Sequence, residues 1–271
     1  MKIHLPHNPT SDTTRHGAVA PGSVLGDWQL DRQIPPKEFE QRLIQYRAAP
    51  EGAPTNFDYL LHTPADPESE SAFFLLQREH HISQQFSNPH LLPVLDVHLE
   101  TTPYFIVTPH LPGSTLRDVL QTRGKLELYH ALWLLRQTTQ AVAALHSHGW
   151  SMPSLLAENI QIEPDGHLTL SAVGHARRME SDVNASVQIH ADTCRLAGLF
   201  IEMTAGDLDD SSGNLQGNSR GPTMLPDGSL SLAMALLGEM LNPREAPDKH
   251  SLQFLVERLV RLEINLLSRP A

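Results

Sequence analysis

The sequence predicts an α+β fold with two lobes, and three observations lead to this prediction. Residues 27–109 contain five strand-like segments and one helical segment, which indicates a small five-stranded antiparallel lobe with one helix. Residues 110–271 are dominated by helical periodicity, which indicates a mainly helical lobe. A single hairpin interrupts the helices. Residues 1–26 are rich in Pro, Thr, Ser, Gly and His without periodicity, so we expect a flexible tail.

The elements of the first lobe follow from short patterns. Its strands alternate apolar and polar residues or concentrate Val, Ile, Leu and Phe. Pro35-Pro36 ends the first strand because proline lacks the N–H that sheet pairing needs. The serine-rich, acidic stretch at Ser69 predicts a capped helix start. We expect strands over 28–34, 42–47, 57–62, 91–99 and 103–109, and a helix over 69–86.

The elements of the second lobe are mostly long apolar stripes at helical spacing. Ser114 or Thr115 caps a short helix that ends before Gly124. Pro164-Asp165-Gly166 is a turn sequence and predicts a hairpin over 160–170. The stretch 206–228 is rich in Gly, Ser, Asp and Asn and predicts a long loop. Further helices are expected over 128–148, 191–204, 230–241 and 251–267.

Composition limits the class of function. The net charge of −11 and the pI near 5.8 argue against a nucleic-acid or anionic-membrane partner. The single cysteine, Cys194, excludes an internal disulfide and fits a reducing compartment. The sequence has no signal-peptide pattern and no apolar run long enough to span a bilayer, so we expect a cytoplasmic protein. The sixteen histidines lack the spacing of a zinc site.

Several motifs occur in a distinctive order. Asn159 lies five residues after Met152-Pro153-Ser154, a hairpin follows, and Ala172-Val173-Gly174 comes next. Arg78-Glu79 lies on the expected first-lobe helix, and Asp192 begins a later apolar helix. In this order the chain resembles a degenerate, bacterial-type serine/threonine protein kinase domain, a pseudokinase, over about residues 27–260. The family usually has His-Arg-Asp-x-x-x-x-Asn where this chain has Met152-Pro153-Ser154 and Asn159. It usually has Asp-Phe-Gly where this chain has Ala172-Val173-Gly174.

The resemblance implies that the catalytic residues are missing. The lysine of the third strand corresponds to His62, and the catalytic base corresponds to Ser154. The lysine two residues after the base corresponds to Leu156, and the metal-binding aspartate corresponds to Ala172. Because phosphoryl transfer needs metal ions and positioned charges, we expect no catalysis, no cofactor and no metal.

Four residues of the degenerate site remain in the family pattern. They are Glu79, Asn159, Gly174 and Asp192. Glu79 is either a solvated charge or a partner of His62. Asn159 is interpreted as an amide that caps its own loop, in preference to a metal ligand. Asp192 is expected to bind the backbone of the degenerate catalytic loop.

The resemblance also implies a blocked nucleotide site. The glycines of the phosphate loop correspond to Pro35, Lys37 and Glu40, and proline cannot donate an amide hydrogen bond to phosphate. Leu60 replaces a small alanine, and Arg42 replaces a valine. We expect both to fill the adenine pocket, beside the gatekeeper Thr108 and the hinge residue His110.

The peptide-substrate platform is expected to be absent as well. Only about fourteen residues separate Arg177 from Ala191, which is too short for a full activation segment. No Ala-Pro-Glu follows, and its usual arginine partner corresponds to Ala246. Met152 and Val173 replace an imidazole and a phenyl ring, so we expect them to keep the packing between the lobes. The acidic run 207–210 is interpreted as a solvated loop.

Three functional hypotheses follow. The first is a catalytically inactive scaffold or allosteric regulator that binds a protein partner, such as a kinase or another signalling protein. The second is an atypical nucleotide-dependent transferase on the same fold. The third is a small-molecule sensor whose remodelled cleft is lined by Leu60, His62, Glu79 and Thr108.

Overall fold

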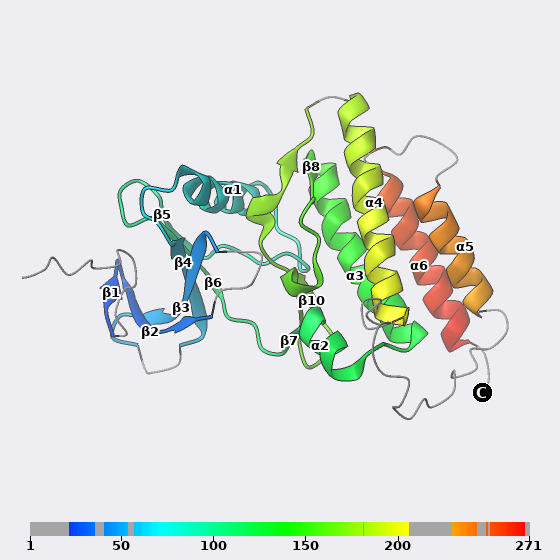
Figure 1. The fold of residues 1–271 in the computed structure, drawn as a ribbon, viewed down its shortest axis with the longest axis horizontal. Helices are drawn as coiled ribbons and strands as arrows, with labels where there is room; N and C mark the ends of the chain where they lie inside the picture. Colours follow the sequence, from blue (N-terminus) through cyan, green and yellow to red (C-terminus); the bar gives the residue numbers. More distant parts are fainter. Residues whose placement is uncertain are drawn as a thin grey trace, which may run out of the picture.

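The computed structural model describes residues 22–35, 41–53, 57–180, 182–205, 229–242, 248 and 250–268. Figure 1 shows the strands β1–β6 gathered in one lobe and the helices α2–α6 gathered in the other. This two-lobed α+β arrangement confirms the predicted fold class. The predictions for residues 1–21, Lys37, Glu40, 206–228 and Ala246 concern residues outside this description.

The first lobe is one antiparallel sheet of six strands in the order β1-β2-β3-β4-β6-β5. It has one strand more than expected because Val24–Leu25, within the stretch expected to be a tail, pairs with Trp28 and Gln29. The strands are β1 (Val24–Leu25), β2 (Trp28–Ile34), β3 (Leu43–Pro50), β4 (Tyr59–Pro64), β5 (Asp96–His98) and β6 (Phe105–Pro109).

The strand predicted over 91–99 is shorter in the structure, where β5 covers Asp96–His98. Only β5 pairs within this sheet, against β6. The preceding residues turn to the other lobe, where the Leu92 N–H donates to the Leu170 carbonyl and the Leu170 N–H donates to the His90 carbonyl. The segment 88–92 therefore connects the two lobes by backbone hydrogen bonds.

Helix α1 (Glu70–Gln85) begins where the sequence predicts. The Ser69 side chain accepts a hydrogen bond from the Ala72 N–H, which satisfies one of the free donors of the first turn. One face of α1, including Leu75 and Leu76, packs on Leu43 and Ile106 of the sheet. The helix is thereby fixed above one face of the sheet (Figure 1).

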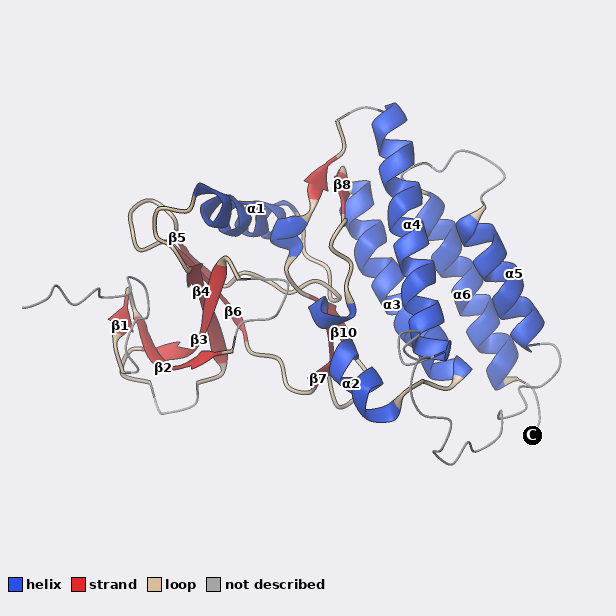
Figure 2. Cartoon of the chain, in the orientation of Figure 1, coloured by secondary structure: helices blue, strands red, loops and turns tan. Residues whose placement is uncertain are grey.

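The second lobe is built around α3, whose apolar residues lie at the centre of the largest core cluster. Figure 2 shows its helices side by side, with short strands where they meet the sheet lobe. The helices are α2 (Leu116–Arg123), α3 (Leu128–Ser147), α4 (Asp182–Ala205), α5 (Ser229–Leu241) and α6 (Ser251–Leu267). Within the described residues, no helix combines the length and apolar character needed to cross a bilayer.

Short elements lie between the sheet lobe and the long helices of the second lobe. The expected hairpin is present as β9 and β10, and β9 also pairs with β7. The other short sheet pairs β8 with β11. These elements are β7 (Ser114–Thr115), β8 (Trp150–Ser151), η1 (Ala157–Asn159), β9 (Ile160–Ile162), β10 (Leu168–Leu170), η2 (Val173–His175) and β11 (Arg177–Arg178).

Helix α4 begins earlier than the sequence indicates. It starts at Asp182, whereas the apolar pattern alone predicts a start at residue 191. Only residues 179–181 connect β11 to this helix. The segment between the hairpin and the buried helix is therefore shorter than expected.

The contact between α3 and α6 includes an ion pair whose strength can be tested. The Arg136 Nε lies 2.9 and 3.0 Å from the two carboxylate oxygens of Glu263, and both side chains are mostly buried. We expect Glu263→Ala to lower the free energy of unfolding by about 3 kcal/mol, because it leaves a buried guanidinium unpaired. Equilibrium urea unfolding measures this loss.

The exposed pair between Glu239 and Arg258 provides the control. Glu239→Ala is expected to cost less than about 1 kcal/mol because water screens an exposed pair. Equal losses in the two variants would contradict the assignment of Arg136 and Glu263 as a buried, stabilising pair.

Candidate functional site: the cleft between the lobes

The cleft face of the sheet is defined by strand register. His62 lies opposite Gln45 of β3 and opposite Ile106 of β6. Leu60 lies opposite Arg47 and Thr108 in the same two strands. Directly opposed residues project from the same face of a sheet, so these side chains share the face on which α1 packs. The predicted neighbours Leu60, His62 and Thr108 therefore lie together.

His62 is held between two side chains of the sheet. Its Nδ1 lies 3.3 Å from the Gln45 amide nitrogen, which can only donate. Its Nε2 lies 2.9 Å from the Thr108 hydroxyl oxygen, and both side chains are buried. The Gln45 and Thr108 side chains thus both contact the imidazole along the sheet.

Arg42 does not fill the cleft, and that prediction is wrong. Its side chain is exposed just before β3, while the next residue, Leu43, is buried against α1. Side chains alternate along a strand, so Leu43, Gln45 and Arg47 of β3 share the face of His62 and Leu60, whereas Arg42 does not. The sequence of one strand does not show which of its residues face the cleft. The pairing of β3 with β4 shows that Arg47 does and that Arg42 does not.

Arg47 takes the position expected of Arg42 and connects β3 to the hinge. Its Nε donates to the Phe57 carbonyl at 2.6 Å. Its guanidinium also donates to the His110 ring, with Nε2 at 3.0 Å. Burial, and then the positive charge of Arg47, lower the pKa of His110 below its ordinary value. A neutral His110 can accept this hydrogen bond, so the hinge is tied to β3 by side chains of the protein itself.

Gly174 is the point at which α1 touches the second lobe. A Cβ at this position would lie 2.5 Å from the Leu75 carbonyl oxygen and 3.2 Å from the Glu79 Oε2. No real side chain tolerates the first distance, so only glycine fits beneath the helix. The buried Glu79 carboxylate is therefore placed over Gly174. The neighbouring Arg78 donates to the Gly174 and Ala176 carbonyls at 3.2 and 3.1 Å.

Ala172 provides a backbone bend and no ligand. Its φ of 60° and ψ of 35° lie in the left-handed region, which costs a residue with a Cβ about 1 kcal/mol. Val173 follows it into the core of the second lobe, as the sequence predicts for a packing residue. The bend thus aims Val173 inward and places Gly174 beneath α1.

The degenerate catalytic loop is closed by Asn159. Its Nδ2 donates to the Ser154 carbonyl at 3.1 Å, so the amide caps the loop as expected. Its Oδ1 is buried and has no hydrogen bond among the described residues. Ser154 is half-buried, and Leu156 points to the surface.

Asp192 organises the start of the same loop. Its Oδ2 accepts from the Met152 N–H at 2.7 Å and from the His146 Nε2 at 2.9 Å. Its Oδ1 accepts from Arg195 at 3.0 Å. The expected contact of Asp192 with the loop backbone is therefore present. Met152 is fully buried in the core of the second lobe.

The two positions at which the family binds metal ions lack a carboxylate here. In nucleotide sites Mg²⁺ is usually held by one or two carboxylates together with substrate phosphates and water. Ala172 supplies none, and Asn159 offers one buried amide oxygen. Among the residues that the structure describes, no three His, Cys, Asp or Glu side chains gather closely enough to bind a metal ion.

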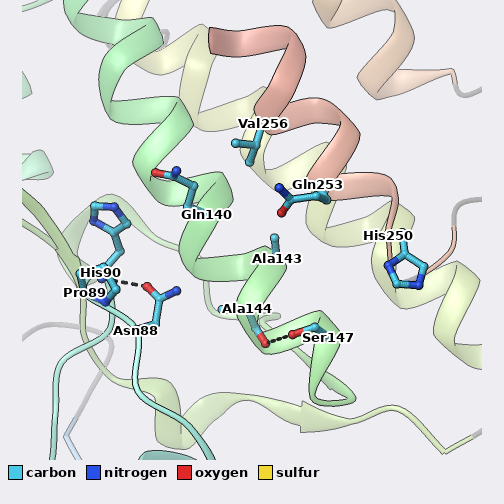
Figure 3. Close-up of a pocket in the computed structure, with 10 residues that line it drawn as sticks. All are labelled: Asn88, Pro89, His90, Gln140, Ala143, Ala144, Ser147, His250, Gln253 and Val256. Carbon is cyan, nitrogen blue, oxygen red and sulfur yellow. Dashed lines mark hydrogen bonds between the residues drawn. The ribbon is translucent and has the colours of Figure 1, made fainter.

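Two cavities lie away from the cleft. The first, of about 360 Å³, lies between the segment 88–90, α3 and α6. Figure 3 shows Ala143, Ala144 and Ser147 of α3 along it, with His90 on one side and Gln253 on the other. The second, of about 510 Å³, is lined by residues of α1, β8, β11 and α4. Leu60, His62, Glu79 and Thr108 line neither of these two cavities.

Sequence reasoning missed Gln45 and Arg47 because their roles depend on strand pairing. It also gave Arg78 no role, although its guanidinium binds two carbonyls of the other lobe. The alternation within β3 indicates that Gln45 and Arg47 lie on one face of the strand. Only the pairing of β3 with β4 shows that this face also carries His62 and Leu60.

The contact at Gly174 leads to a direct prediction. We expect Gly174→Ala to lower the free energy of unfolding by about 2–3 kcal/mol, because the added methyl group must displace the Leu75 carbonyl. Thermal and urea unfolding measure the change. The loss should be accompanied by faster amide hydrogen exchange in α1.

Gly198 of α4 is the matched control, since a Cβ there meets no atom within 4 Å. Gly198→Ala should raise stability by roughly 0.5–1 kcal/mol, because alanine favours the helix. A neutral or stabilising effect of Gly174→Ala would contradict the proposed close approach of α1.

Comparison with known proteins gives a family assignment for part of the chain. The model of the protein kinase domain family matches residues 64–194. The chain is 27% identical over 99 residues to a probable serine/threonine-protein kinase of Clostridium perfringens, covering 36% of this chain and 14% of the relative. It is 26% identical over 152 residues to the serine/threonine-protein kinase PknB of Mycolicibacterium smegmatis, covering 54% and 24% respectively.

A third relative is the human hormonally up-regulated neu tumor-associated kinase, 29% identical over 99 residues, which are 36% of this chain and 14% of that protein. The aligned residues span about a quarter or less of the length of these relatives. The residues that match the family model contain α1, the hinge and the hairpin of β9 and β10. Residues 64–194 thus match a protein kinase domain, with distant similarity to serine/threonine kinases, within a two-lobed α+β fold.

Proposed function

We propose that this protein is a catalytically inactive kinase-like domain that acts as a scaffold or allosteric regulator for a protein partner. The observation that carries the proposal is the hydrogen bonding of His62 to Thr108, together with the lack of a carboxylate at Ala172. Phosphoryl transfer depends on charges and metal ions positioned against the phosphates. A histidine bonded to Thr108 and an alanine replace the lysine and the metal-binding aspartate that the family uses for these two tasks.

Contacts within the cleft support the absence of nucleotide binding. The Arg47 side chain crosses from β3 to His110, which follows the last strand of the sheet. Leu60 lies between Arg47 and Thr108 in the register of the sheet. A ligand in this space would have to break the Arg47 contacts and rehydrate or replace buried polar groups, which is costly.

Contacts between the lobes support a role that depends on shape. The Trp150 indole donates to the Gln85 side chain at 2.9 Å, and Phe86 stacks on His148 with ring centres 3.9 Å apart. With the Gly174 contact, these interactions join α1 directly to the second lobe. A rigid two-lobed surface is suited to binding another protein, and the net charge of −11 disfavours nucleic acid.

One observation favours the alternative of an atypical nucleotide-dependent transferase. The Asn159 Oδ1 is buried without a hydrogen bond among the described residues. An amide oxygen in this state could serve a metal ion after a small rearrangement. Metal-dependent nucleotide binding would support this alternative.

Thermal unfolding with ATP distinguishes the two functions. At about 1 mM ATP, a site with a Kd of about 10 µM would stabilise the protein by about 2.7 kcal/mol and raise Tm by roughly 5–10 °C. We expect no shift with ATP alone, with Mg²⁺ or with Mn²⁺. The Arg47→Ala variant, which opens the link to the hinge, provides the comparison.

A metal-dependent rise in Tm of the unchanged protein would contradict the proposal. So would phosphoryl or nucleotidyl transfer that Asn159→Ala or Glu79→Ala abolishes. A rise confined to Arg47→Ala would support self-occlusion of the cleft by Arg47.

A further inference from the structure

The first cavity is lined by uncharged groups. It has a volume of about 360 Å³ and lies between the segment 88–90, α3 and α6 (Figure 3). Among the described residues that line it there is no lysine, arginine, aspartate or glutamate. Arg136 and Glu263, the charged pair between the same two helices, are bonded to each other. The cavity therefore offers no charge to balance an ion, and the group that enters it must be uncharged.

Three polar side chains of the cavity use one of their polar atoms within the protein and present the other. The Asn88 Oδ1 accepts from the His90 N–H at 2.8 Å, so its NH₂ group remains available to donate. The Gln140 Oε1 accepts from Arg136 at 3.2 Å, so its NH₂ group remains available in the same way. The His90 Nδ1 lies 2.9 Å from the Leu168 carbonyl oxygen, which can only accept. In the neutral ring Nδ1 therefore carries the hydrogen, and Nε2 is an acceptor.

The neutral form of His90 is favoured by its surroundings. Burial lowers the pKa of the ring, and the opposing effects of the Leu168 carbonyl and the Gln140 side chain do not cancel it. The wall of the cavity thus combines two amide donors with one imidazole acceptor.

An exposed apolar row on α6 begins at the same cavity. Gln253 and Val256 line the cavity, and Val260, Ile264 and Leu267 follow them at spacings of three and four residues. Residues at these spacings share one face of a helix. The last three are 37%, 55% and 68% exposed. From Val256 to Ile264 the row extends about 12 Å along the helix.

The cavity and the row fit two parts of one ligand. A primary carboxamide has an oxygen that accepts two hydrogen bonds and an NH₂ group that donates, which matches the two donors and the acceptor of the wall. Aliphatic side chains fit the row, because burying apolar surface drives association. A polypeptide carries both kinds of group, and an extended chain covers about 12 Å in roughly four residues.

We propose that the first cavity and the row Val260, Ile264 and Leu267 form a docking site for a segment of a partner protein, in which a glutamine or asparagine enters the cavity and an aliphatic residue about four positions away covers the row. A second copy of the chain is a poorer occupant, because two molecules with a net charge of −11 repel each other. The inference rests on the proposed scaffold role for the existence of a partner. It is independent of whether the interlobe cleft binds nucleotide.

Binding of peptide pools to the full chain tests the proposal. The first pool has a fixed glutamine with leucine four positions before and after it. In the second pool glutamate replaces the glutamine, and in the third serine replaces both leucines. Glutamate has the shape of glutamine but lacks the NH₂ donor and carries a charge that the cavity does not balance. We expect the first pool to bind at least about ten times more tightly than either of the others.

Two substitutions remove the donors that face the ligand. Asn88→Asp and Gln140→Glu each retain the oxygen that accepts a hydrogen bond within the protein. We expect the double variant to bind the glutamine pool about tenfold or more weakly. Gln77→Glu with Gln121→Glu adds the same charge at exposed positions outside the cavity and should bind like the unchanged protein.

A substitution in the row provides a second test that does not alter a buried group. Ile264→Ser changes an exposed side chain and should weaken binding of the glutamine pool to the level of the serine pool. Met234 on α5 is also apolar and is 60% exposed, so Met234→Ser is the matched control and should leave binding unchanged.

Other outcomes would overturn the inference. They are equal binding of the glutamine and glutamate pools, equal loss in either control, and full binding by both the Asn88/Gln140 and the Ile264 variants. Binding of N-acetylglutamine amide as tightly as the first pool would also do so, because it would show a small-molecule site that does not use the row. These results leave the proposed inactive role standing, because that role fails separately, through a metal-dependent ATP shift in Tm.

Discussion

The approach of α1 to Gly174 is the constraint on which the arrangement of the two lobes depends. Because a Cβ at residue 174 would lie only 2.5 Å from the Leu75 carbonyl oxygen, the helix can approach this closely only over glycine. Arg78 then reaches the carbonyls on either side of the turn, and Ala172 adopts a left-handed conformation to form it. The Trp150 and Phe86 contacts extend the same interface along the helix. These direct contacts between protein groups join the two lobes.

The cleft beside this joint satisfies many of its polar groups internally. Thr108 and Gln45 orient His62, and Arg47 ties β3 to His110. In an active phosphotransferase, comparable positions need groups that are free to meet phosphate and metal. These internal bonds are the physical basis for proposing a scaffold whose cleft does not bind nucleotide.

Sequence reasoning succeeded where the signal is local. Ser69 and Thr115 cap their helices as expected, and α6 has the predicted bounds because its apolar spacing is regular. It failed where pairing between distant segments decides the result. Arg42 was assigned to the cleft because it aligns with a valine of the resembled family, whereas the pairing of β3 with β4 places Arg47 there. The strand over 91–99 was overestimated because residues near Leu92 pair with Leu170 of the other lobe. The motif order located Asn159, Gly174 and Asp192, but not the bonds that His62 makes.

Hydrogen–deuterium exchange of the ligand-free protein tests the central claim most directly. If protein contacts alone hold α1 on the turn at Gly174, amides in the buried part of α1 and in residues 172–176 should exchange only through global unfolding. Their protection should match that of α3 and should not change with ATP and Mg²⁺. Much weaker protection of α1 than of α3, or added protection when ATP and Mg²⁺ are present, would contradict the claim that the joint is complete without a ligand.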